Sequence, residues 1–92
     1  MASLRDLKKD INFLTSEIFT ECYVKQFAKA DVDKKNLAGI MVEAVKFRNE
    51  FIARTNHYDG KDNPKVVKDY FKKLRHDLLA GYIKMSKDIE GL

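Results

Sequence analysis

The sequence predicts an all-α protein, an up-down-up antiparallel three-helix bundle formed by a single domain over residues 1–92. Apolar residues recur at spacings of three and four in three long segments, as in helices with a buried face. The composition, 45% apolar and 35% charged with four glycines and one proline, favours helices with solvated outer faces. Two short breaks separate the segments, as between antiparallel neighbours. We expect helices at about 4–29, 33–55 and 64–90.

The first predicted helix has two apolar faces. Ser3 and Asp6 are suited to its start, as a capping hydroxyl and a carboxylate near the positive end of the helix dipole. The main apolar stripe contains Leu4, Leu7, Ile11, Leu14, Ile18 and Cys22. A second set projects from nearly the opposite side and consists of Phe13, Thr20, Val24 and Phe27. A helix that is apolar on two faces is expected to contact two neighbours.

The middle helix should be capped by Asp31 or Asp33 and end near residue 55. Its polar face includes Glu50 and Arg54 at a spacing of four, and Gly39. The expected buried stripe consists of Leu37, Ile40, Met41, Ala44, Val45, Phe51 and Ile52.

Arg48 projects from the centre of this apolar stripe. A charge at such a position needs a partner, and the carboxylates within the expected reach are Glu17, Glu21 and Asp77. We therefore predict a buried ion pair of Arg48 with one of them. The alternative is an arginine that faces a groove and binds a phosphate or carboxylate.

The third helix follows a turn-rich loop over residues 56–63, with Asn63 as cap and Pro64 at the first helical position. Gly81 lies in its apolar face, where it allows a close helix crossing. The apolar stripe contains Val67, Tyr70, Phe71, Leu74, Leu78, Tyr82, Met85 and Ile89. Leu79 and Ile83 lie outside this stripe and form a second apolar patch.

Composition makes several function classes improbable. With Cys22 as the single cysteine and two histidines, His57 and His76, we expect no metal site and no cofactor. Residues 59–63 lack the alternating oxygen ligands of a calcium loop. No apolar run is long enough to span a bilayer, and the N-terminus lacks the apolar core of a signal peptide, so we expect no membrane association and a cytoplasmic location.

Two resemblances add expectations. The segments Phe47-Arg48-Asn49, Phe51-Ile52 and His57-Tyr58 resemble the signature of the HEPN superfamily of all-helical proteins, which implies a metal-independent ribonuclease site containing Arg48, Asn49 and His57. Nearly the whole chain resembles a group of short all-helical bacterial proteins with no assigned activity. That resemblance rests on residues 6–14, residues 47–54, Asn63-Pro64-Lys65 and Tyr70-Phe71, and implies the bundle alone.

We therefore predict a non-enzymatic interaction module that forms a homodimer or binds a protein partner. The expected interface consists of Phe13, Val24, Phe27, Leu79 and Ile83. One alternative is the ribonuclease that the HEPN resemblance implies. The other is weak, nonspecific nucleic-acid binding, because the net charge is +4 and the excess lies on the third helix. The candidate anion-binding residues there are Lys65, Lys68, Lys72 and Lys73.

Overall fold

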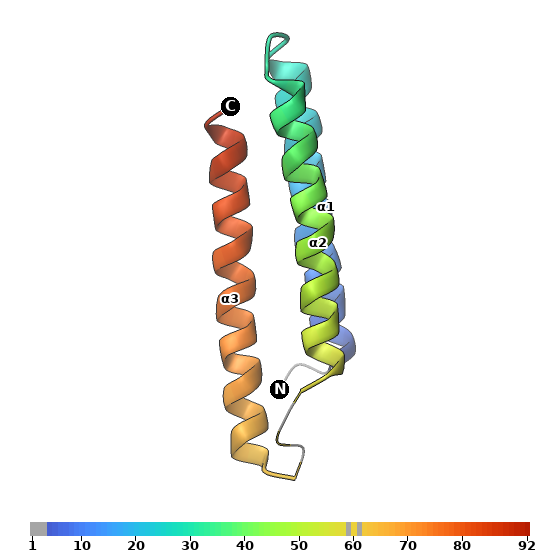
Figure 1. Ribbon diagram of the computed structural model, residues 1–92, viewed down its shortest axis with the longest axis vertical. Helices are drawn as coiled ribbons and strands as arrows, with labels where there is room; N and C mark the ends of the chain where they lie inside the picture. Colours follow the sequence, from blue (N-terminus) through green and yellow to red (C-terminus); the bar gives the residue numbers. More distant parts are fainter. Residues whose placement is uncertain (1–3, 59, 61) are drawn as a thin grey trace.

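The computed structural model describes residues 4–58, 60 and 62–92. It contains α1 (Leu4–Ala28), α2 (Lys34–Asn56) and α3 (Pro64–Glu90), each packed against the other two (Figure 1). The all-α three-helix fold is confirmed, and each helix boundary lies within one residue of its predicted position. Within the described residues, none of the helices is both long and apolar enough to cross a membrane.

Side-chain caps explain where α2 and α3 begin. Asp33 accepts hydrogen bonds from the Asn36 backbone N–H at 3.1 Å and its side-chain amide at 2.9 Å, so Asp33 is the cap of α2. Val32, just before this cap, is buried in the same cluster as Leu37, which is the packing of a hydrophobic staple. Asn63 caps α3 by accepting from the Lys65 N–H at 3.1 Å. The predicted cap Ser3 lies outside the described residues.

Gly60 makes the turn before α3 possible. Its φ of +77° lies in the left-handed region, and an added Cβ would collide with the Val66 side chain. The Asn63 N–H donates to the Gly60 carbonyl at 2.8 Å, which closes the turn. Asp59 and Lys61, which belong to the predicted loop, lie outside the described residues.

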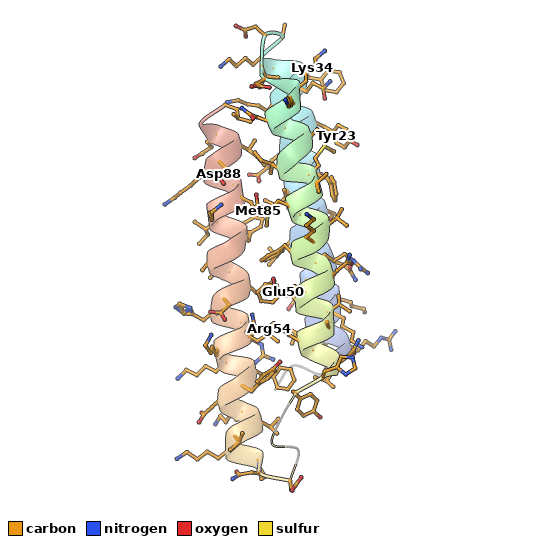
Figure 2. All side chains as sticks on the ribbon, in the orientation of Figure 1. Tyr23, Lys34, Glu50, Arg54, Met85 and Asp88 are labelled. Carbon is orange, nitrogen blue, oxygen red and sulfur yellow. The ribbon has the colours of Figure 1, made fainter. Side chains whose placement is uncertain are left out.

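The core consists of two clusters joined by Phe47. The first cluster lies toward the α1–α2 turn and contains Ile18, Cys22, Val32, Leu37, Ile40, Ala44, Met85 and Ile89. The second lies toward the start of α3 and contains Leu7, Ile11, Phe51, Phe71, Leu74 and Leu78. Phe47 packs against both clusters and contacts the Phe51 ring, with centroids 4.6 Å apart and planes tilted by 49°. Figure 2 shows Met85 on the side of α3 that faces the other helices.

Gly81 lies against Phe47, so α3 approaches the centre of α2 through a residue without a side chain. A Cβ at Gly81 would overlap the edge of the Phe47 ring, with Cζ at 3.1 Å. The close crossing expected at Gly81 is therefore confirmed. Gly39 does not mark a close helix crossing, because nothing lies within 4 Å of a Cβ placed there.

Polar contacts set the register between the parallel helices α1 and α3. The Ser86 hydroxyl donates to Glu21 Oε1 at 2.8 Å, and Lys25 Nζ donates to the Glu90 carbonyl at 3.1 Å. Each of these pairs is 65 residues apart in sequence, so a residue of α1 lies level with the α3 residue about 65 positions later. By this register Leu4 is level with residue 69, and the first turn of α3 extends beyond the described start of α1 (Figure 1).

Candidate functional site

All five residues of the predicted interface are exposed. The exposed fractions are 61% for Phe13, 59% for Val24, 89% for Phe27, 54% for Leu79 and 42% for Ile83. We call this set the α1/α3 apolar face. The prediction that these residues stay outside the core is confirmed, whereas their role in an interface stays a prediction.

By the register of α1 and α3, Leu79 and Ile83 lie between the levels of Phe13 and Val24, whereas Phe27 lies further toward the ends of both helices. By the register of Glu21 and Ser86, Leu79 and Ile83 lie level with residues 14 and 18 of α1. Ser86 follows Ile83 by three positions and faces α1, so Ile83 lies on the same flank of α3. Phe13 precedes the level of Leu79 by one residue, so these two exposed residues lie at nearly the same height along the bundle.

Two polar residues of α1 next to the apolar residues of this face are already hydrogen-bonded to their own helix. Ser16 Oγ donates to the Phe13 carbonyl at 2.8 Å, and Thr20 Oγ1 donates to the Ser16 carbonyl at 3.0 Å. Phe13, Thr20 and Phe27 follow one another at intervals of seven residues. Because the hydroxyl protons have partners, covering this stripe would cost less than the sequence alone suggests.

The structure also exposes apolar residues that the periodicity did not single out. Val45 was predicted to be buried but is 44% exposed, and Leu4 is 40% exposed. The buried stripe of α2 is rotated toward Phe47, which lies between the two clusters, so Val45 is left on the outer side. Val42 and Tyr23 are 55% and 53% exposed, and Figure 2 shows Tyr23 on the side of α1 away from α3.

The predicted ion pair of Arg48 with a carboxylate is wrong. Arg48 is half-buried, and its Nε donates to Asn12 Oδ1 at 2.6 Å while Nη1 donates to Asn49 Oδ1 at 3.1 Å. None of Glu17, Glu21 and Asp77 forms an ion pair with Arg48 among the described residues. The physical reason is position: Arg48 lies at the α1/α2 edge, where the neighbouring residue of α1 is an asparagine.

Arg54 forms the interhelical ion pair instead. Its Nη2 lies 3.1 Å from Asp77 Oδ2, which also accepts from Lys73 at 2.9 Å (Figure 2 labels Arg54). The guanidinium carbon lies 4.7 Å from the centre of the Phe51 ring, and the Tyr70 hydroxyl donates to the Arg54 carbonyl at 2.8 Å. Hydrogen bonds from Lys73 and then Arg54 lower the pKa of Asp77. Arg54 thus joins α2 to α3 rather than pairing with Glu50 on the outer face.

Glu21 places a carboxylate at the α1–α3 contact. Its Oε1 accepts the Ser86 hydrogen bond, while its Oε2 is buried and has no hydrogen-bond partner among the described residues. Burial, and then the charge of Glu21, raises the pKa of the Cys22 thiol and of the Tyr82 hydroxyl. Cys22 is buried in the core, as predicted, and the raised pKa makes its reactive thiolate scarce.

The structure brings together two of the three residues that the HEPN resemblance implies. Arg48 and Asn49 are hydrogen-bonded to each other. His57 is exposed and follows the last residue of α2. At 1.5 Å per helical residue, it lies ~13 Å from Arg48 along the helix axis. Within one chain these residues therefore do not form a compact catalytic group, and the described residues contain no group of three metal-ligating side chains.

The predicted basic face of α3 divides into two parts. Lys65, Lys68 and Lys72, together with Arg75, line a cavity of about 930 Å³ near the start of α3. Lys73 does not line it, because it points toward α2 and pairs with Asp77. Lys73 is therefore not part of a common anion-binding set. Arg75 completes the group, since its spacing of three from Lys72 places both on a shared helix face.

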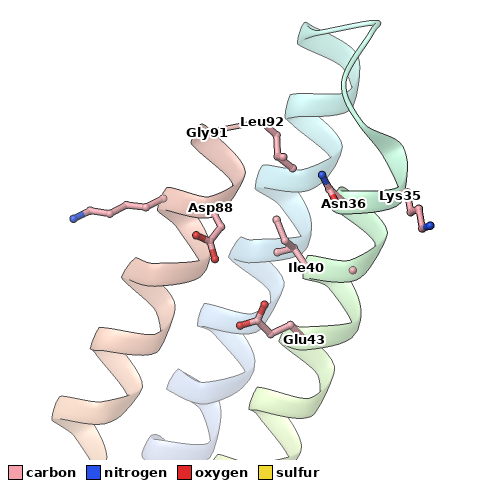
Figure 3. A pocket seen from close by; sticks show the side chains of 9 residues that line it. Lys35, Asn36, Ile40, Glu43, Asp88, Gly91 and Leu92 are labelled. Carbon is pink, nitrogen blue, oxygen red and sulfur yellow. The ribbon is translucent and has the colours of Figure 1, made fainter.

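A second, more open groove of about 600 Å³ lies between the start of α2 and the end of α3 (Figure 3). Its apolar base includes Ile40 and Leu92, and its rim carries charges of both signs. Lys84 bridges Glu43 at 3.5 Å and Asp88 at 3.0 Å along one side. This balance of charges gives the groove no preference for an anionic or cationic ligand.

Comparison with known proteins adds no relative: no family model matches the chain, and neither the curated proteins nor the solved structures include a significant match. The two resemblances described for the sequence stay predictions.

Proposed function

We propose that this protein is a non-enzymatic helical interaction module that self-associates as a homodimer through the α1/α3 apolar face. The single observation that carries the proposal is the exposure of two phenylalanines on α1, 61% for Phe13 and 89% for Phe27. Aromatic side chains dominate protein interfaces and are costly to leave in water. Composition favours the cytoplasm as the compartment in which this association takes place.

The exposed phenylalanines supply about half of the area that an interface of this kind needs. At ~200 Å² for a phenylalanine side chain, the two exposed fractions leave about 300 Å² of aromatic surface in water on each copy. Two copies would contribute about 600 Å² from these residues, half of the ~1,200 Å² at which stable interfaces begin. Val24, Leu79 and Ile83 supply further apolar surface next to them.

The spacing on α1 is compatible with a two-fold pairing of two copies. Phe13 and Phe27 are equally distant from Thr20, seven residues on either side. A two-fold axis at Thr20 pairs two α1 helices antiparallel and places each Phe13 on the Phe27 of the other copy.

The test compares two valines of similar exposure. Val24 (59% exposed) lies on the proposed face, and Val42 (55% exposed) lies on α2. Sedimentation at micromolar concentration should give a dimer for the parent and for Val42→Asp, whereas Val24→Asp should raise the dissociation constant at least tenfold, because a buried unpaired carboxylate is costly. Phe27→Asp should act like Val24→Asp. A monomeric parent, or equal effects at Val24 and Val42, would contradict the proposal.

A second candidate function is the ribonuclease that the HEPN resemblance implies. It is favoured by the partners of Arg48: two amide oxygens hold the guanidinium without neutralising its charge, which leaves it able to bind a phosphate. The purified protein should then cleave RNA without metal, and Arg48→Ala should abolish cleavage while Arg5→Ala, at an exposed arginine of α1, should not. No cleavage by the parent protein, or unfolding of Arg48→Ala, would leave Arg48 a structural residue.

A further inference from the structure

The cavity near the start of α3 combines an apolar lining with a basic rim. Its volume is about 930 Å³, within the range of small-molecule sites. The apolar part is formed by Leu4, Tyr58, Val67 and Phe71. Tyr58 packs its ring edge-on against Phe71, with centroids 5.0 Å apart, so one wall is fixed by aromatic contact. None of these residues belongs to the α1/α3 apolar face.

The charges around this cavity are strongly one-sided. Four cationic side chains line it, Lys65, Lys68, Lys72 and Arg75, against the single carboxylate of Asp69. Among the described residues, none of these four cations forms an ion pair, whereas Lys73, on the neighbouring flank of the same helix, is paired with Asp77. The cavity therefore attracts anions without first breaking an existing salt bridge.

We propose that this cavity binds a free single-chain amphiphile with an anionic head group, such as a fatty acid. The tail lies on the apolar lining and the carboxylate meets the lysines and Arg75 at the rim. The backbone amides at the start of α3 are not the anion site, because Asn63 already accepts from the N–H groups of Lys65 and Val66. Recognition of the head group thus falls to the side chains.

The lining favours an amphiphile over a nucleic acid. Single-stranded nucleic acids are held by a basic groove together with aromatic faces on which bases stack. Here Phe71 is 8% exposed, the half-buried Tyr58 packs against it, and Leu4 and Val67 are aliphatic. Aliphatic surface suits a hydrocarbon chain, and the two halves of the cavity match the two halves of an amphiphile.

Calorimetric titration with dodecanoate, below the concentration at which it forms micelles, tests the proposal. We expect one saturable site per chain, at least tenfold weaker binding of octanoate, and little binding of dodecyltrimethylammonium, which has the same tail and the opposite charge. Lys68→Glu/Lys72→Glu should weaken dodecanoate binding at least tenfold. Lys34→Glu/Lys35→Glu makes the same change of charge at the opposite end of the bundle and should leave affinity within twofold (Figure 2 labels Lys34).

Several outcomes would overturn the proposal. Equal weakening by the two double variants, both folded by circular dichroism, would mean that net charge alone attracts the ligand. Equal affinity for dodecanoate and the cationic amphiphile would remove the role of the rim. Binding to phosphatidylglycerol vesicles or to a 12-nucleotide single-stranded RNA, without saturable dodecanoate binding, would assign the lysines to a membrane or nucleic-acid surface instead. The parent failing to bind dodecanoate at all would refute the site whatever the oligomeric state.

Discussion

Replacing Gly81 by alanine should destabilise the bundle, whereas the same replacement at Gly39 should stabilise it. Both glycines lie inside helices, so each alanine gains ~1 kcal/mol from helix propensity. At Gly39 nothing opposes this gain, since no atom lies within 4 Å of the new Cβ. At Gly81 the Cβ overlaps the Phe47 ring, which both core clusters hold in place, and overpacking of this kind costs ~1–3 kcal/mol.

The net expectation is a gain of ~1 kcal/mol for Gly39→Ala and a loss of up to ~2 kcal/mol for Gly81→Ala. In a domain of this size 1 kcal/mol shifts the melting temperature by ~4–8 °C, so the two variants should melt at least ~4 °C apart. Thermal unfolding followed by circular dichroism at one fixed protein concentration measures this, since self-association makes the midpoint depend on concentration. The reasoning would be refuted if Gly81→Ala melted as high as Gly39→Ala. Phe47→Leu should reduce the penalty at Gly81, because the two sites are in contact.

Two further predictions concern titratable groups. The pKa of Asp77 is lowered by Lys73 and Arg54, so this carboxylate stabilises the fold above its unfolded pKa, and the contribution is lost as the pH falls below ~4 toward the lowered value. Asp77→Asn should therefore lower the free energy of unfolding, measured with urea at neutral pH, and reduce the loss of that free energy as the pH falls. Asp69→Asn should do neither. The same loss in acid for the parent and for Asp77→Asn would contradict the assignment. Burial raises the pKa of the Cys22 thiol. The thiol of the native protein should therefore react with a disulfide reagent at pH 8 far more slowly than the thiol of the urea-unfolded chain. Comparable rates would mean that Cys22 is accessible in the native protein.

The helix boundaries were predictable because they depend on local chemistry. Asn63 followed by Pro64 combines a capping side chain with a residue that needs no amide partner, and the structure begins α3 there. The choice between Asp31 and Asp33 was not local, since both are capping residues. Val32 and Leu37, buried in one cluster, occupy the two positions of a hydrophobic staple when Asp33 is the cap.

The exposure of the apolar residues of α1 was also predictable from the sequence. Phe13, Val24 and Phe27 lie nearly opposite the main stripe of α1, and a helix at the corner of a three-helix bundle cannot bury both sides. Val45 was misassigned because each helix here faces two neighbours, so its buried surface is wide and its centre is not set by periodicity. Phe47, rather than Arg48, takes the centre of α2, because Gly81 leaves room for a ring at that point of α3.

The two arginines of α2 show which information the sequence lacked. Both occur on a helix with carboxylates within plausible reach, but only the relative rotation and register of the helices decides which one meets a carboxylate. Arg54 meets Asp77, so its charge is compensated at the α2/α3 contact. Arg48 meets Asn12, a neutral partner that orients the side chain without cancelling its charge. Arg48 therefore keeps an uncompensated cation at the α1/α2 edge, and of these two residues it is the one able to bind an anion.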